Sequence, residues 1–133
     1  MHRVITRTLP LFVILAFAGG VIAAGNLPPQ SSSESGVTVK VTPRSLAGAA
    51  WEFEVVFDAH SGDLKDDLLK AAVLVADGGA PLSPTGWQGD GPGGHHRKGV
   101  LRFKPAAASP ASIELRVQRP GEAAPRVFRW KLR

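Results

Sequence analysis

The chain of 133 residues contains no cysteine and no tyrosine, and Met1 is its one methionine. Without a thiol there is no disulfide, no Cys-ligated zinc site and no cysteine nucleophile. Thioether ligation of copper is excluded once the first residue is removed. The sequence also lacks a glycine-rich phosphate loop placed between a strand and a helix, and it has no motif for an oxyanion hole. These absences argue against an enzyme, and we expect none.

Residues 9–25 have almost no polar character. Arg3 and Arg7 precede the uncharged apolar run 9–25, which ends in the small residues of 23–25. A basic, then apolar, then small-residue order is typical of a secretory signal peptide, which predicts that 1–25 is a signal. The alternative is an uncleaved N-terminal anchor, although Pro10 weakens a long helix. In both cases we expect the remainder of the chain to be extracytoplasmic, in the periplasm or at the cell surface.

Residues 26–36 (NLPPQSSSESG) are rich in proline and serine, which predicts a linker. The remaining chain, 37–133, then forms one folded domain of a size that buries a core without disulfides. The body of the protein is therefore predicted to begin at Val37.

The folded part alternates apolar and polar side chains, which predicts β-strands. Six segments show this pattern or a short apolar run: 37–42, 51–58, 72–76, 100–104, 112–119 and 126–133. Pro43 is expected to end the first strand. Residues 63–70 favour one or two helical turns capped by Ser61, with Asp66 and Asp67 in solvent. We predict an all-β fold, a small immunoglobulin-like β-sandwich of six to seven strands with one short helix, with a partly open barrel as the alternative.

Charge divides along the chain. Residues 34–90 hold nine acidic and four basic side chains, whereas 91–133 hold ten basic and two acidic ones. One interpretation is that acidic and basic strands neutralise each other across a sheet. The other is a basic face that binds an anionic surface, formed by Arg116, Arg129, Lys131 and Arg133. Nucleic acid is not expected as a partner, because the aromatic residues lie on the apolar faces of their strands.

A long loop, 78–99, contains eight glycines and three prolines. Loops of this length in a small domain are usually functional or disordered. Trp87 and Leu82 offer apolar area that could dock on the body of the domain. Trp87 is therefore a candidate interaction residue.

Three histidines flank the best strand and this loop. His60 follows the strand 51–58, and His95 and His96 lead into the strand 100–104. Imidazole binds Cu(II) and Zn(II), and a nearby carboxylate could complete the shell. The candidate carboxylates are those of Asp58, Asp63 and Asp90. The competing interpretation gives the histidines packing and turn roles only.

Three segments carry a resemblance to a family of exported prokaryotic domains without an established activity. The segments are FDAHSGDL (57–64), GGHHRKGVLRF (93–103) and RVFRWKL (126–132). They resemble that family's THSxDL-like turn, its GGHHxxGxLxF segment and its C-terminal FxW strand, with Ala59 where threonine is expected. The resemblance spans about 37–133 and implies a secreted β-sandwich.

Two functions follow as expectations. The first is an exported envelope binding or accessory module that holds a divalent transition metal through His60, His95 and His96. The second is a non-catalytic domain that binds an envelope protein or an anionic surface through Trp87 and the basic C-terminal residues. Contact with the membrane is expected only through an uncleaved N-terminal segment.

Overall fold

The computed structural model describes residues 27–133, and the predicted signal or anchor segment 1–25 lies outside this range. Eight strands and one short helix follow one another in the described part of the chain. They are β1 (Gln30–Glu34), β2 (Val37–Ser45), β3 (Trp51–Ala59), α1 (Leu68–Ala71), β4 (Ala72–Ala76), β5 (Gly86–Gly89), β6 (His96–Phe103), β7 (Ser112–Val117) and β8 (Arg126–Lys131). Within 27–133, no helix has the length and apolarity that crossing a membrane requires.

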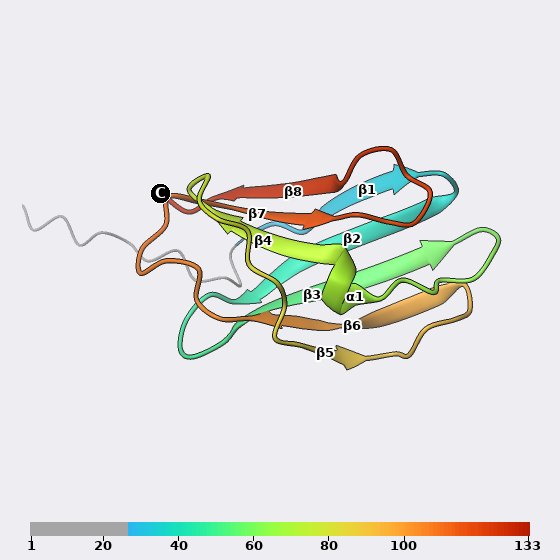
Figure 1. Ribbon diagram of the computed structural model, residues 1–133, viewed down its shortest axis with the longest axis horizontal. Helices are drawn as coiled ribbons and strands as arrows, with labels where there is room; N and C mark the ends of the chain where they lie inside the picture. Colours follow the sequence, from blue (N-terminus) through green and yellow to red (C-terminus); the bar gives the residue numbers. More distant parts are fainter. Residues whose placement is uncertain (1–26) are drawn as a thin grey trace, which may run out of the picture.

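The strands form two antiparallel sheets. One has the order β1-β2-β3-β6-β5, and the other has the order β4-β7-β8. Figure 1 shows the two sheets as layers, with α1 at the point where the chain crosses from β3 to β4. The prediction of an all-β sandwich is confirmed, with eight strands instead of six to seven.

The core lies between the sheets and follows the predicted alternation. On β3, the side chains of Trp51, Phe53, Val55 and Phe57 are buried, because every second residue of a strand points to the same face. The Phe53 and Phe103 rings meet edge to face with their centroids 5.8 Å apart. The buried cluster joins side chains from both sheets, among them Phe53 and Leu101 of the larger sheet and Leu115 of the smaller one.

Two strand boundaries differ from prediction at the N-terminal side. Residues 30–34, assigned to a linker, form β1, which pairs with β2 from Gln30↔Val41 to Glu34↔Val37. Serine-rich sequence becomes a strand here because the neighbouring edge of β2 supplies backbone partners. Pro43 does not end β2, which continues to Ser45 through an irregularity between Pro43 and Ser45. Proline is tolerated at such a bulge because no ladder bond is required of its nitrogen.

β1 also joins the two sheets along one side of the sandwich. The Gln30 side-chain amide donates to the Arg129 carbonyl and accepts from the Arg129 N–H, 2.9 Å away, so it bonds the edge strand β8 as another strand would. The Trp130 indole Nε1 donates to the Pro28 carbonyl at 2.8 Å. The free edge of β8 is thereby covered, which protects it from pairing with other chains.

The helix is shorter and later than predicted. Asp67, and not Ser61, is the N-cap of α1, and its side chain accepts from the Leu69 N–H. Leu64 and Leu68 are buried as expected, but Leu69 is 46% exposed. A single helical turn cannot bury all three leucines, because 63–67 are not helical and do not follow its period.

Candidate functional site

Four connections meet at one end of the sandwich, which we call the loop end. They are the β1–β2 turn at 35–36, the segment 60–67 after β3, the β5–β6 loop at 90–95 and the β7–β8 loop at 118–125. Figure 1 shows these connections gathered at the end opposite to the C-terminus and to the start of the described chain.

Backbone hydrogen bonds join the histidine-bearing segments of the loop end. The Ala59 N–H donates to the His95 carbonyl at 2.7 Å, and the His60 N–H donates to the Gly36 carbonyl at 3.0 Å. The Leu64 N–H then donates to the Gly94 carbonyl at 3.0 Å. The segment after β3 and the loop before β6 are thus adjacent, with positive φ angles at Gly93 and Gly94 that favour glycine.

The side chains of the three histidines do not converge. His96 Nδ1 lies 2.6 Å from Asp58 Oδ1, in a cross-strand pair in which both side chains are largely exposed. Among residues 27–133, no group of three or more His, Asp or Glu side chains is placed to hold a metal ion, and this includes His60, His95 and Asp63. A tetrahedral zinc site needs at least three protein ligands, whereas this pair supplies two.

We therefore expect no stoichiometric metal on the purified chain. Native mass spectrometry with equimolar Zn(II) or Cu(II) should show the same metal content for the natural chain and for His95→Ala/His96→Ala, because only weak, surface-type binding is available. One tightly bound ion per chain that is lost in the double variant would contradict this expectation and support the metal-site hypothesis.

A buried carboxylate lies beneath the loop end. Asp66, expected in solvent, is 3% exposed and receives two hydrogen bonds from Arg119, one from Nε and one from Nη2, each 3.0 Å long. Arg119 is itself 9% exposed and reaches Glu122 Oε2 at 3.4 Å. The bidentate geometry explains how a carboxylate is tolerated inside the domain, because both charges are paired and hydrogen-bonded.

A second buried arginine, Arg126, ties β8 to the β1–β2 turn. It is 3% exposed, and each of its five N–H groups has an acceptor. Two bonds reach Glu122, and three reach the carbonyls of Ser32, Glu34 and Val37. The Arg126 guanidinium holds the pKa of Glu122 below its usual value, and Glu122 in turn raises the pKa of Arg126.

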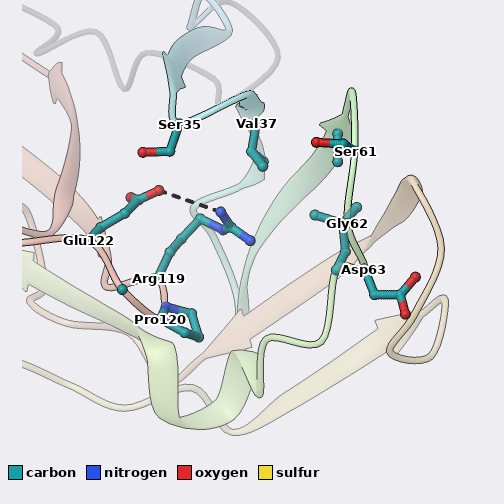
Figure 2. A pocket seen from close by; sticks show the side chains of 11 residues that line it. Ser35, Val37, Ser61, Gly62, Asp63, Arg119, Pro120 and Glu122 are labelled. Atoms are coloured by element: carbon teal, nitrogen blue, oxygen red, sulfur yellow. Dashed lines mark hydrogen bonds and ion pairs between the residues drawn. The ribbon is translucent and has the colours of Figure 1, made fainter.

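A shallow pocket of about 250 Å³ opens over this network. Figure 2 shows Arg119 and Glu122 on one side of it, joined by an ion pair, with Ser61, Gly62 and Asp63 on the other side. Its one arginine is already paired with Asp66 and Glu122, so the pocket offers no free cation to an anionic ligand.

Trp87 docks on the core face of the larger sheet, at the edge. It pairs with Leu101, and its ring lies across Gly99, where a Cβ would be 2.5 Å from the Trp87 ring. Its indole Nε1 donates to the Asp90 carbonyl at 3.0 Å. Glycine at position 99 therefore leaves the space that the ring fills.

Beside Trp87 is a hollow of about 370 Å³, which we call the Trp87 groove. Its lining residues are Lys65, Asp66, Asp67, Leu68, Leu69, Trp87, Pro92 and Arg97. Apolar side chains form most of one wall, and the buried Arg97 lies with its guanidinium carbon 5.4 Å from the centre of the Trp87 ring. Such a mixture of apolar wall and few polar groups is typical of a ligand site.

The basic C-terminal residues do not form a continuous unpaired patch. Arg116 and Arg129 both bond Glu114, and these two guanidinium groups hold the pKa of Glu114 below its usual value. The Arg129–Glu114 pair is the cross-strand neutralisation considered from the sequence, whereas Arg116 bonds Glu114 along the same strand, β7. Lys131 and Arg133 are exposed at the end of the sandwich opposite the loop end.

Sequence reasoning did not single out Arg97, Arg119 or Arg126, or the buried role of Asp66. A signal was nevertheless present for two of the arginines. Arg126 is in phase with the buried Phe128 and Trp130, and Arg97 is in phase with the buried Leu101 and Phe103. A charged residue in the inward phase of a strand predicts a buried, hydrogen-bonded charge.

Comparison of the chain with protein-family models, with curated proteins and with solved structures finds no match.

Proposed function

We propose that this protein is an exported, non-catalytic binding module of the cell envelope, which holds a protein partner at the loop end through the Trp87 groove. The observation that carries the proposal is the groove itself, a largely apolar hollow at the β5 edge of the larger sheet that is bordered by the exposed Leu69. We infer export because residues 1–25 have the basic, then apolar, then small-residue order of a secretory signal peptide.

We further infer that the sandwich is immunoglobulin-like with one added strand. The orders β2-β3-β6-β5 and β4-β7-β8 correspond to the ABED and CFG sheets of a constant-type immunoglobulin domain, and β1 precedes the first of these strands. In that correspondence the loop end carries the B–C, D–E and F–G loops, and two of these, B–C and F–G, are among the binding loops of variable domains.

The distribution of exposed apolar side chains favours the groove as the binding surface. Among the described residues, Leu69 and Val127 are the large hydrophobic side chains with high exposure, at 46% and 41%. Leu69 borders the groove next to Trp87, whereas Val127 lies on the outer face of β8 and lines neither of the two hollows described above. An exposed apolar side chain beside a hollow marks an interaction site more strongly than one that is isolated on a sheet.

The position of the chain ends supports the same surface. The described chain begins and ends at the end of the sandwich opposite to the loop end (Figure 1). A segment that precedes residue 27 therefore joins the domain away from the groove.

The test selects peptides from a displayed random library on the purified full chain and measures their affinity for two matched variants. Leu69→Asn is expected to weaken the selected peptides at least tenfold, because burial of a leucine side chain is worth about 1.5–3 kcal/mol. Val127→Asn removes the other exposed apolar side chain and should leave the affinity within twofold. Peptides that are weakened by Val127→Asn but not by Leu69→Asn would move the binding surface to β8 and reject the proposal.

A further inference from the structure

Arg97 differs from the other two buried arginines of the domain. It is 4% exposed, yet among the ion pairs of residues 27–133 none includes Arg97. Arg119 pairs with Asp66 and Glu122, and Arg126 pairs with Glu122. Arg97 thus lines the Trp87 groove without a carboxylate bonded to it, unlike the other two buried arginines.

The existing contacts of Arg97 satisfy only part of its guanidinium. Nε donates to the Asp90 carbonyl at 3.0 Å, and Nη1 donates to the Asp66 carbonyl at 2.6 Å. Arginine has five N–H donors, and within the described chain Nη2 makes no hydrogen bond. This nitrogen is accessible to solvent, since no fully buried side-chain nitrogen or oxygen of the described residues lacks a partner. The Trp87 ring beneath the guanidinium adds a cation–π contact, which fixes the plane of the group without neutralising it.

None of the nearby carboxylates bonds the Arg97 guanidinium in the described residues. Asp66 bonds Arg119 through both oxygens, Asp67 caps α1, and the Asp90 side chain accepts from the Lys98 N–H. Residues 1–33 contain no Asp or Glu, so the segment outside the described range supplies no acidic side chain. The free donor of Arg97 is therefore open to a carboxylate of another molecule.

We propose that the Trp87 groove binds the C-terminal carboxylate of a partner polypeptide that ends in an apolar residue, with the carboxylate on Arg97 and the last side chain against Trp87 and Leu69. This inference rests on the proposed function and names the chemistry of its partner. A planar guanidinium that is held in one orientation suits a carboxylate, because the two groups form parallel hydrogen bonds.

The size and charge of the groove favour this occupant over other anions. A C-terminal residue carries its carboxylate and its side chain on the same carbon, so both fit a hollow of about 370 Å³ that places a cation beside an apolar wall. An internal Asp or Glu would bring its carboxylate without an adjoining apolar side chain of the same residue. A phosphate dianion would be repelled more strongly than a carboxylate by Asp66 and Asp67, which also line the groove.

The experiment titrates small probes into the isotope-labelled full chain and follows the Trp87 indole N–H and the Arg97 Nε–H by NMR. N-acetyl-leucine has the free carboxylate, N-acetyl-leucine amide lacks it, and N-acetyl-aspartate α-amide carries a side-chain carboxylate only. Inorganic phosphate is the fourth probe. We expect saturable shifts with N-acetyl-leucine and at least tenfold weaker binding of the other three.

Two variants separate the carboxylate contact from the apolar wall. Arg97→Gln keeps donors for the two carbonyls but removes the charge, and should weaken N-acetyl-leucine at least tenfold while leaving the amide unchanged. Leu69→Asn, which changes an exposed side chain and leaves the buried core intact, should weaken both probes to the same degree. Its amide spectrum and that of Arg97→Gln show whether each variant keeps the fold.

The failures of the two proposals are distinguishable. Equal binding of N-acetyl-leucine and its amide, with peptides from the library still dependent on Leu69, would overturn the carboxylate site and leave the binding module in place. Preference for phosphate or for the aspartate probe would also overturn it. Library peptides that do not depend on Leu69 would reject the proposed function and this inference together.

Discussion

Replacing Arg126 with methionine is expected to lower the free energy of unfolding by about 3–5 kcal/mol. The variant keeps the length and apolar volume of the side chain but removes all five hydrogen bonds of the guanidinium. It leaves Glu122, whose side chain is 3% exposed, as a buried carboxylate facing only the more distant Arg119. Urea unfolding followed by tryptophan fluorescence measures the loss.

The double variant Arg126→Met/Glu122→Gln is the control for this prediction. Because it removes both charges, it should recover more than 1 kcal/mol of the loss, as expected when an unpaired buried charge is the main cost. A single variant within 1 kcal/mol of the natural chain would show that this network does not hold β8 to the β1–β2 turn.

The Arg126–Glu122 pair also makes the free energy of unfolding depend on pH in the acid range. The pKa of Glu122 is lowered in the folded state, first by its hydrogen bond to Arg126. A group with a lowered folded pKa stabilises the fold above its unfolded pKa, about 4.3, and loses that contribution as the pH falls through the folded value. The natural chain should therefore lose more stability below about pH 4 than the Arg126→Met/Glu122→Gln variant. Parallel losses in the two chains would contradict this.

The second large effect is expected at Asp66. Replacement with alanine leaves Arg119, 9% exposed, without its bidentate partner, and should cost about 3–5 kcal/mol of unfolding free energy. The neighbouring Asp67 is the matched control, because Asp67→Ala removes only the N-cap of a one-turn helix and should cost about 1 kcal/mol. Chemical denaturation of the two variants compares them directly.

The comparison is decisive because the two aspartates are adjacent in sequence and differ mainly in burial. Equal losses for Asp66→Ala and Asp67→Ala, or a larger loss for Asp67→Ala, would mean that the Asp66–Arg119 pair does not stabilise the loop end.

The strands that form the core were predictable from the sequence. Period-two alternation placed Phe53, Leu115 and Trp130 on inward faces, where the structure has them buried. The reason is physical, since a sheet that is buried on one face requires this period. The sequence also placed Trp87 against the body of the domain, because a tryptophan in a glycine-rich loop has apolar area to bury.

Other features could not be predicted from local pattern. β1 has the serine-rich composition of a linker and becomes a strand only because β2 offers it backbone partners, while β8 bonds its Gln30 side chain. Asp66 and Asp67 are identical in type and adjacent, and only the distant Arg119 decides that one is buried and the other caps a helix. The metal hypothesis required the segments of His60 and His95 to meet, and backbone bonds do join them, but backbone proximity at Ala59 and His95 does not direct imidazole rings to one point.

The central claim is that the loop end binds a partner at the Trp87 groove. Its most direct test is an NMR perturbation map of the full chain with the tightest peptide selected from the library. The account predicts that the largest amide and indole shifts fall on Leu68, Leu69, Trp87 and Arg97, with little change on the outer face of β7 and β8. Shifts centred on Arg116, Val127 and Lys131 instead, with the Trp87 indole unmoved, would contradict it.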